Sequence, residues 1–373
     1  MKPEQKIRLG LIFGGRSGEH EVSLMSAQSV LVALDPEKYE VTQIGITHKG
    51  EWIVGENILE LMSKGETRNL TSVTLFPDPT RRGIYAIRKS SAGEALEHFI
   101  DLDVTFPLLH GTFGEDGTLQ GLFEIAGMAY VGAGVLGSSL GMDKGVFRDT
   151  LRAHNIPVVE TLVVTRSEIN SQVEEVITKA ERLTDYPLFV KPANLGSSVG
   201  VTKCHNRSDL LEGLMEAARF DRRILVERGV NARELEVSIL GNDDPKASVV
   251  GEIRPAAEFY SYEAKYHDDR SELLIPAPIS SEISERVRQL AIQAYKAVDC
   301  AGMARVDFFM DKESGELYLN ELNTIPGFTR ISMYPKLWDA SGLPYPRLID
   351  RLIELAFERH RERERTEWRY YRQ

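Results

Sequence analysis

RVDFFMDKESGELYLNELNTIPGFTR, residues 305–330, is the stretch that decides the fold of this chain. Residues 304–310 and 317–323 are rich in the apolar, aromatic and β-branched side chains that favour strands. Between them, residues 311–316 form a cluster of the kind that favours turns. The pattern therefore predicts a β-hairpin folded about Glu313–Ser314.

The predicted hairpin brings oxygen-bearing side chains together. Side chains alternate along a strand, so Glu321 and Asn323 share one face, and the fold of the hairpin brings Asp307 within a position of Glu321. Oxygen donors without His or Cys suit hard cations, and Mg²⁺ often binds one or two carboxylates together with substrate phosphates. We interpret the hairpin as a metal and phosphate platform. The alternative is a solvated acidic face.

The composition is that of an ordinary globular protein. The 373 residues predict two or three domains, with 42% apolar and 27% charged side chains. The net charge of −11 and the lack of a basic patch argue against a nucleic-acid partner. Cys204 and Cys300 have no metal-ligand spacing, and we expect two buried thiols. No signal-peptide or membrane-span pattern is found, so we expect a cytoplasmic protein.

The N-terminal part alternates strands and helices. Glycine-rich loops at 14–21 and 110–117 follow strands and open helices, as in an α/β sheet whose ligands bind at the carboxyl ends of the strands. We expect strands at 7–13, 41–47, 52–54 and 103–109, and helices at 22–34 and 119–126. Residues 55–100 show little pattern and are predicted to be irregular. We place the end of the first domain near Gly137.

The rest of the chain divides into two further predicted domains, 138–227 and 228–373. In the central domain we expect helices at 144–154, 167–183 and 208–219, with strands at 160–164, 188–191, 201–204 and 223–227. In the last domain we expect strands at 234–240 and 247–253, a helix at 284–298, the hairpin and a closing amphipathic helix. The apolar face of that helix holds Leu348, Ile349, Leu352, Ile353 and Ala356.

Two short patterns point to other functions. Gly132-Ala-Gly-Val-Leu-Gly137 fits the dinucleotide fingerprint, but it lies far from the first βα turn and has no evident ribose-binding acid. Gly196-Ser-Ser-Val-Gly200 fits the nucleophile elbow of hydrolases, with Ser198 as nucleophile. An elbow joins a strand to a helix, whereas residues 201–205 continue as a strand. We therefore favour a flap whose backbone N–H groups and hydroxyls cover phosphates.

Two lysines accompany this flap. Lys191 stands just before it, and Lys144 lies in Met142-Asp-Lys144. Both could offset the charge of nucleotide phosphates, although each alone is as well explained as a surface lysine. The Walker A pattern is missing from the sequence, so the expected nucleotide site lies between a β-hairpin flap and the acidic hairpin.

These residues together resemble the ATP-grasp superfamily and, within it, the D-alanine–D-alanine ligase family. The matching motifs follow the family order over nearly the whole chain. They are GGRSGEHEVS (14–23), HGTFGEDGTLQG (110–121), MDK (142–144), KPANLGSSVG (191–200), YEAKY (262–266), RVD (305–307) and NELNTIPGFT (320–329). The resemblance implies an α/β, three-domain ATP-grasp architecture with an N-terminal Rossmann-like domain and two α+β ATP-grasp subdomains.

The resemblance also implies roles for single residues. For ATP, these are Lys144, Lys191, Ser198, Glu227, Gly229, Val230 and Glu234. For two Mg²⁺ or Mn²⁺ ions, they are Asp307, Glu321 and Asn323. The first D-alanine would meet Glu19, Ser197, Tyr266 and His110, and the carboxylate of the second would meet Lys265 and Ser332. Arg305 and the N–H of Gly327 would form the oxyanion site.

The implied reaction is the ATP-dependent joining of two D-alanines through a D-alanyl phosphate, for peptidoglycan precursor synthesis, by a homodimer. Alternatives remain open at this point. One is a ligase that uses D-lactate or D-serine as second substrate, and Tyr266 argues against D-lactate. Another is a catalytically silent nucleotide-binding scaffold, although every implied catalytic position is filled. The third is the hydrolase with Ser198.

Overall fold

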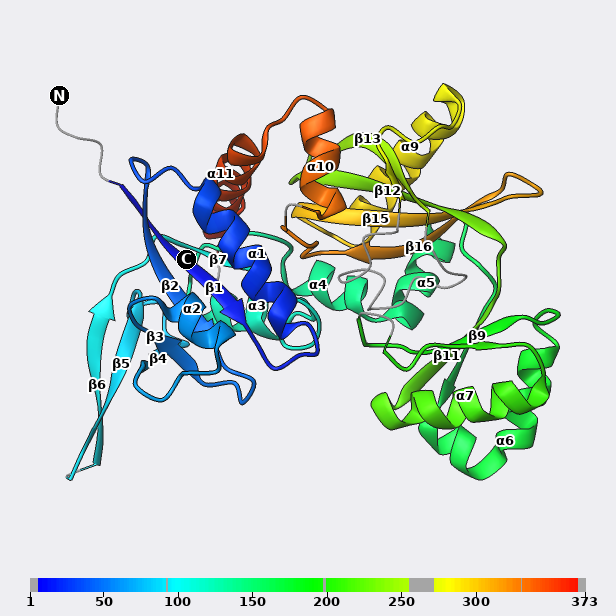
Figure 1. Ribbon diagram of the computed structural model, residues 1–373, viewed down its shortest axis with the longest axis horizontal. Coiled ribbons are helices and arrows are strands. Elements are labelled where there is room, and N and C mark those ends of the chain that lie inside the picture. The colour runs from blue at the N-terminus through cyan, green and yellow to red at the C-terminus, as the bar shows by residue number, and fades with distance from the viewer. Residues whose placement is uncertain (1–5, 92, 197–198, 255–271, 330, 368–373) are drawn as a thin grey trace, which may run out of the picture.

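The computed structural model describes residues 6–91, 93–196, 199–254, 272–329 and 331–367. The described strands form three sheets of seven, four and five strands. Figure 1 shows the seven-stranded sheet on one side, with the five-stranded sheet above the four-stranded sheet on the other. Among the described residues, no helix has both the length and the apolar character needed to cross a membrane.

The first sheet has a parallel centre and an antiparallel flank. In the centre, β1 pairs in parallel with β2 on one side and with β7 on the other. β1 is buried along most of its length because elements cover both faces, which explains its continuous apolar run. The strands are β1 (Ile7–Gly14), β2 (Tyr39–Ile46), β3 (Trp52–Val54), β4 (Thr71–Leu75), β5 (Ile84–Ser90), β6 (Gly93–Ile100) and β7 (Val104–Pro107). The helices are α1 (His20–Ala33), α2 (Ile58–Ser63) and α3 (Thr118–Ile125).

The prediction that residues 55–100 are irregular was wrong. This segment holds α2 and the antiparallel strands β4, β5 and β6, which extend the sheet outward (Figure 1). β6 is exposed along nearly its whole length, so it lacks the half-buried alternation by which a strand is recognised in a sequence.

The four-stranded sheet has the order β10-β9-β11-β8, and its described pairs are antiparallel. β9 and β10 pair directly, so residues 196–200 join two strands rather than a strand and a helix. This confirms the hairpin interpretation over the hydrolase elbow. The elements are β8 (Thr161–Thr165), α6 (Arg166–Glu181), β9 (Leu188–Pro192), β10 (Thr202–Cys204), α7 (Arg207–Phe220) and β11 (Arg223–Arg228).

The five-stranded sheet has the order β14-β13-β12-β15-β16 and carries the predicted hairpin as β15 and β16. Apolar side chains of β12, β15 and β16 pack with α9 into one core. The elements are β12 (Ala232–Gly241), β13 (Lys246–Arg254), β14 (Glu272–Leu274), α9 (Ser281–Ala297), β15 (Gly302–Asp311), β16 (Leu317–Asn323) and α10 (Met333–Ala340).

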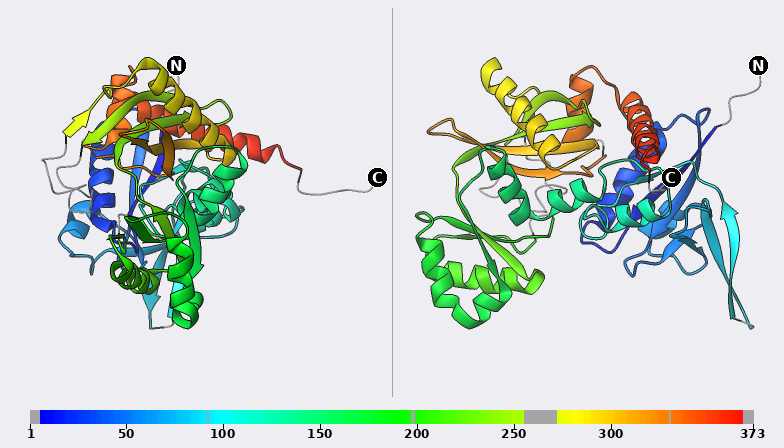
Figure 2. Two further views of the ribbon diagram at one scale, coloured as in Figure 1. Left: turned by 90° about the vertical axis from the view of Figure 1, so that its right-hand side faces the viewer. Right: turned by 180° about the vertical axis from the view of Figure 1, so that it is seen from behind.

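Helices connect the three sheets. α4 (Val135–Met142), which was not predicted, leads into α5 (Lys144–Ala153), and Figure 1 shows both between the sheets. Asp143 directly follows the last residue of α4. Its side chain caps α5, because it accepts from the N–H groups of Gly145 and Val146 at 3.0 Å. α11 (Tyr345–Glu364) buries the predicted apolar face against the core of the first sheet. The view from behind shows this helix beside that sheet (Figure 2).

Candidate active site

A cavity of about 1090 Å³ lies where the three sheets meet. Its walls come from the loops after β1 and β7, from α4 and α5, from the β9–β11 sheet and from the hairpin. Twelve of the residues proposed from the sequence line it: Glu19, His110, Lys144, Lys191, Glu227, Gly229, Val230, Glu234, Arg305, Glu321, Asn323 and Gly327. Segments far apart in the sequence therefore contribute to one space.

The hairpin has the expected register at the proposed metal ligands. Asp307 pairs with Glu321, and Arg305 pairs with Asn323. The side-chain amide of Asn323 lies 3.2 Å from Asp307 Oδ2 and 3.4 Å from Glu321 Oε1. The amide Nδ2 of Asn323 therefore donates toward both carboxylates, and rotation of the amide would present its oxygen in the same place. Two carboxylates and an amide oxygen are a set that fits a hard divalent cation.

A bulge at Asn320 explains how β16 can be both apolar and acidic. Asp307 pairs with Glu321 but Phe308 pairs with Leu319, so Asn320 has no partner in the register. The extra residue shifts the alternation, so Leu319 and Leu322 are both buried while Glu321 reaches the cavity. The Asn320 carbonyl accepts from Arg148, whose Nη2 also donates to Asn320 Oδ1 at 3.2 Å.

Arg305 lies between two carboxylates. Its Nε and Nη2 each donate to an oxygen of Asp307 at 2.7 Å, in the bidentate geometry that fixes a guanidinium. Its Nε also lies 3.0 Å from Glu236 Oε2. Glu236 was missed in the sequence. It pairs with Asp307 in the register of β12 and β15, a neighbour relation that only the sheet order shows.

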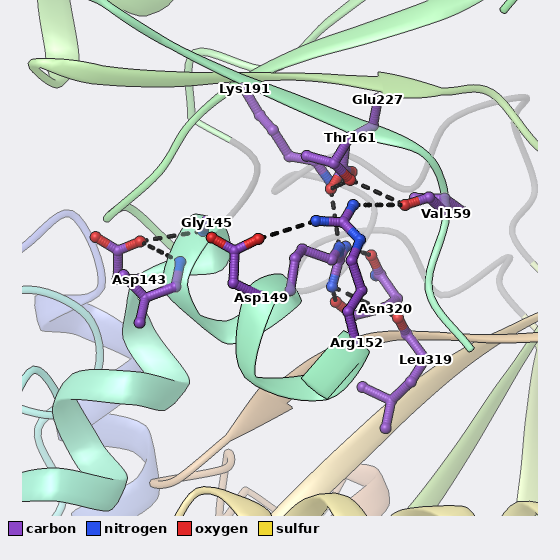
Figure 3. Close-up of polar contacts among 12 residues, drawn as sticks. Asp143, Gly145, Asp149, Arg152, Val159, Thr161, Lys191, Glu227, Leu319 and Asn320 are labelled. Atoms are coloured by element: carbon purple, nitrogen blue, oxygen red, sulfur yellow. Dashed lines mark hydrogen bonds and ion pairs between the residues drawn. The ribbon is translucent and has the colours of Figure 1, made fainter. Parts of the chain in front are cut away.

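A buried ion cluster joins the second and third sheets (Figure 3). Glu227 of β11 is 2% exposed and forms ion pairs with Arg148, at 3.0 Å, and with Lys191 of β9. Burial alone would raise the pKa of Glu227, but the charges of Arg148 and Lys191 lower it to about 2. Arg148 is fully buried and was not identified in the sequence. It connects Lys191 and Glu227 to Asn320, next to Glu321.

Lys144 has a different environment from Lys191. Its Nζ donates to the carbonyl oxygen of Leu195 at 2.7 Å, just before the flap. Burial lowers its pKa, and the charge of Glu321 works against that shift. An additional anion in the cavity would therefore stabilise the charged form of Lys144.

Glu19 reaches the cavity from the loop before α1. A Cβ at Gly111 or at Gly196 would lie 2.8 Å from Glu19 Oε2, so both glycines leave room for this carboxylate. Gly111 also has a φ of +75°, which favours glycine for a second reason. The Glu19 carboxylate thus lies between the loop after β7 and the start of the flap.

His110 is held through both ring nitrogens. Nδ1 lies 2.9 Å from the carbonyl oxygen of Ile325, so it is the donor, and Nε2 lies 3.1 Å from Ser26 Oγ. Burial lowers the pKa of His110, which favours this neutral ring. Ser26 in turn accepts from the N–H of Phe328 at 3.3 Å. His110 therefore positions the loop that carries Gly327.

Glu115 lines the cavity close to these groups and was missed in the sequence. Its Oε1 accepts from the N–H of Gly111 at 2.7 Å, and its Oε2 accepts from the N–H of Ile325 at 3.3 Å. Burial and the charge of Glu19 raise the pKa of Glu115 to about 8. Glu115 thus joins two loops as a neutral acid at pH 7.

The other proposed residues differ in how they lie. Gly229 donates its N–H to the carbonyl oxygen of Pro187 at 3.0 Å, so that donor is already used. Ser332 is not among the cavity-lining residues, and its hydroxyl lies 2.7 Å from that of Thr329. Asp307 is not among the cavity-lining residues either, and its carboxylate forms a bidentate pair with Arg305 at 2.7 Å. Ser197, Ser198, Lys265 and Tyr266 lie outside the described residues.

Comparisons with known proteins agree over nearly the whole chain. Residues 8–133 match the family model for the D-ala D-ala ligase N-terminus, and residues 150–354 match that for the C-terminus. A D-alanine–D-alanine ligase of Thermoanaerobacter sp. strain X514 is 51% identical, with 98% of this chain and 100% of the relative covered. That of Natranaerobius thermophilus is 48% identical, with 97% and 98% covered.

Solved structures show the same fold. The D-alanine–D-alanine ligase of Coxiella burnetii has a TM-score of 0.79 at 36% identity, over 96% of each chain. The VanG D-Ala:D-Ser ligase of Enterococcus faecalis has a TM-score of 0.83 at 35% identity, over 94% of this chain and 100% of that one. The expected α/β fold of ATP-grasp type is confirmed. The chain belongs to the D-alanine–D-alanine ligase family.

Proposed function

We propose that the chain joins two D-alanines into D-alanyl-D-alanine at the expense of ATP, through a D-alanyl phosphate. The observation that carries this proposal is the convergence of three kinds of group on one cavity. These are the carboxylate of Glu19, the two lysines Lys144 and Lys191, and the oxygen ligands of the hairpin. The curated relatives that are about half identical to this chain have the same name, D-alanine–D-alanine ligase.

We propose that Asp307, Glu321 and Asn323 hold two Mg²⁺ or Mn²⁺ ions together with the phosphates of ATP. The three side chains meet, with Asn323 Nδ2 at 3.2 Å from Asp307 and 3.4 Å from Glu321, and turning the amide would give a donor set of oxygens alone. When bound, the ions offset charge on the transferring phosphoryl group, a contribution mainly of positioning and electrostatics. Arg305 already neutralises one of the carboxylates, Asp307, before any nucleotide arrives.

The lysines would act as phosphate cations. Lys191 is held by Glu227 and Lys144 by the Leu195 carbonyl, so both ammonium groups stand at the cavity wall. Because the Glu227 carboxylate is occupied by Lys191 and Arg148, its side chain serves better to hold Lys191 than to meet the base. We assign the main chain near Val230 to the adenine and the Glu234 carboxylate to the ribose.

The amino-acid half of the cavity would bind the first D-alanine. The carboxylate of Glu19 suits its ammonium group. After phosphorylation, the deprotonated amine of the second D-alanine would attack the acyl carbon, and the resulting oxyanion would collapse by breaking the C–O bond to phosphate, which leaves. Arg305 and the N–H of Gly327 would stabilise the oxyanion, an interaction whose loss typically costs about 10²–10³ in rate. His110 and Glu115 hold the loop that carries Gly327, so its N–H has a fixed direction.

The direct test is ADP release by the purified chain with D-alanine, ATP and Mg²⁺, with the dipeptide identified by mass spectrometry. We expect Glu321→Gln to lower turnover by about 10²-fold or more, the scale seen when an electrostatic group of the transition state is lost. Glu313→Gln, at the exposed turn of the same hairpin, is the matched control. Nucleotide binding without turnover would favour the scaffold, and unchanged turnover in Glu321→Gln would refute the metal assignment.

The identity of the second substrate is a separate question, since one structural relative is a D-Ala:D-Ser ligase. We assign D-alanine, because the relatives with the higher identity are D-alanine–D-alanine ligases. We expect Tyr266→Phe to raise the ratio of D-lactate to D-alanine product near neutral pH. An unchanged ratio in a competition assay would remove Tyr266 from this choice. We also propose a homodimer, which light scattering of the purified chain tests.

A further inference from the structure

We propose that His20, Glu21 and His48 form a binding site for a transition-metal ion such as Zn²⁺, separate from the oxygen ligands of the hairpin. The ligand atoms of the three side chains all lie within 4.8 Å of one another. Two of them come from the start of α1, and the third from the turn after β2. The inference does not depend on the proposed function.

The chemistry of the donors selects the class of metal. Two imidazoles and one carboxylate, with water in a fourth position, are a ligand set that Zn²⁺ uses in proteins. Imidazole also suits Cu²⁺ and Ni²⁺, whereas Mg²⁺ and Ca²⁺ prefer oxygen. The two sites therefore differ in kind, and an excess of Mg²⁺ would fill the hairpin without competing at His20 and His48.

His20 is oriented as a ligand before any metal arrives. Its Nδ1 lies 2.8 Å from the carbonyl oxygen of Gly15, so Nδ1 is the donor, and no described protein atom forms a hydrogen bond with Nε2. A metal-binding His commonly donates its other N–H to a carbonyl or carboxylate in this way.

Glycine at position 14 makes room for this ring. A Cβ at Gly14 would lie 3.0 Å from the Cε1 atom of His20 and 2.2 Å from the carbonyl oxygen of Ile46. Gly14 also has a φ of +93°, which side chains disfavour. The backbone therefore places the His20 ring against the end of β2, close to the turn that carries His48.

His48 stands on an ordered turn. The N–H of Gly50 donates to the carbonyl oxygen of Thr47 at 2.9 Å. The N–H of Thr47 donates to the carbonyl oxygen of Glu51, also at 2.9 Å. The two imidazole rings are stacked with centroids 3.7 Å apart and an interplanar angle of 24°. His48 Nε2 lies 3.5 Å from Glu21 Oε1. Tetrahedral ligands at about 2.0–2.2 Å are separated by roughly 3.4 Å, and each imidazole binds a metal in the plane of its ring. Closure therefore requires the exposed His48 ring to turn out of the stack, together with a rotation of Glu21.

Charges near the site act in both directions. The positive end of the α1 dipole opposes one, but Glu21 lies in the first turn and Glu19 directly before it. Two cations are close in sequence: Lys49 follows His48 directly, and Arg16 has its guanidinium over the ring of Phe113, 4.8 Å from the centroid. A bound ion would link the β2–β3 turn to α1 and so fix the segment from which Glu19 projects.

The test is calorimetric titration of Zn²⁺ into the full chain in the presence of excess Mg²⁺. We expect one Zn²⁺ per chain, a Zn²⁺-dependent rise in Tm, and binding weakened by about 100-fold in His48→Ala, the upper end of what loss of a supporting group costs. The side chain of His48 is 64% exposed, so this variant keeps its fold. Co²⁺ in place of Zn²⁺ should give the visible absorption of a tetrahedral site, lost in the same variant.

Two controls make the outcome decisive. His98→Ala removes another exposed histidine beside a carboxylate, 2.9 Å from Asp101, and should leave Zn²⁺ binding unchanged. Both cysteines are buried with pKa values raised to about 12 by burial, so they hold their protons and do not compete. Wild-type affinity in His48→Ala, loss of binding in His98→Ala, or removal of Zn²⁺ by excess Mg²⁺ would each overturn the site.

Discussion

The pKa values of two glutamates that line the same cavity are shifted in opposite directions. Glu227, on the side proposed for the nucleotide, has a pKa of about 2, whereas Glu115, on the side proposed for the amino acid, has a pKa of about 8. Burial raises the pKa of both. The difference lies in the partners. Glu227 has two cations within ion-pair distance, whereas Glu115 accepts from two backbone N–H groups and faces the charge of Glu19.

The comparison shows two ways to join parts of a protein. Around Glu227, ion pairs with Arg148 and Lys191 hold the four-stranded sheet to the hairpin, and each buried charge is compensated by its partners. Around Glu115, a neutral acid bridges the loops after β7 and β16 by hydrogen bonds alone. Removing one member of a buried ion pair leaves a charge without compensation, whereas replacing a neutral acid by an amide leaves none.

The largest effect is expected for Arg148→Met. It leaves the buried Glu227 with Lys191 alone and removes the donor to the Asn320 carbonyl. We expect a loss of about 3–5 kcal/mol in the free energy of unfolding, measured by urea denaturation at pH 7.

Arg152→Met, one turn further along α5, is the matched control. The side chain of Arg152 is 40% exposed and pairs with Asp149 at 3.0 Å, an ion pair worth about 0–1 kcal/mol. Figure 3 shows this pair beside the buried cluster. Equal losses in the two variants would contradict the special role of the buried charges.

Glu227→Gln should show a smaller effect that depends on pH. A lowered pKa gives stability that is full above the unfolded value of 4.5 and is lost as the pH falls toward about 2. The variant lacks this contribution, which is on the order of 3 kcal/mol for the shift from 4.5 to about 2. The difference in the free energy of unfolding between wild type and variant should therefore become smaller below pH 4.5. Urea denaturation at pH 7 and at successively lower pH would reveal a constant gap if this account is wrong.

How much the sequence reveals depends on the distance along the chain between partners. Asp307, Glu321 and Asn323 were predicted together because one hairpin turn sets their register. Arg148 meets Asn320 across 172 positions, and Glu115 meets Ile325 across 210. No periodicity connects such pairs, so neither role was predicted, although Glu115 lies in a motif that the sequence analysis identified.

The fold followed the same rule. The buried strands and the amphipathic helices were predicted to within a few residues, because burial imposes a period on the sequence. The exposed β5–β6 extension was missed, since its few buried positions leave no such period. β4, α2, α4 and α10 were missed as well, and each of them is eight residues long or shorter, which leaves little room for a period. The predicted boundaries at 137 and 227 remain predictions, and α11 packs against the core of the first sheet rather than only its own.

Of the variants considered, Glu115→Gln should change the free energy of unfolding least, when it is measured at low pH. Glutamine resembles the neutral acid and can keep its carbonyl on the N–H of Gly111 at 2.7 Å, so only the longer contact to Ile325 is lost. We expect a change of about 1 kcal/mol or less at pH 4.5, from urea denaturation.

The pH dependence of this variant should run opposite to that of Glu227→Gln. A raised pKa gives stability that is full below the unfolded value of 4.5 and is lost as the pH rises toward about 8. Wild type should therefore lose stability relative to Glu115→Gln across that window, with no further change above it. The free energy of unfolding of each variant is compared with that of wild type at each pH. If this difference changes in the same direction with pH for both variants, the charge environments of the two glutamates do not differ. The contrast between the ion-paired and the neutral contact is then wrong.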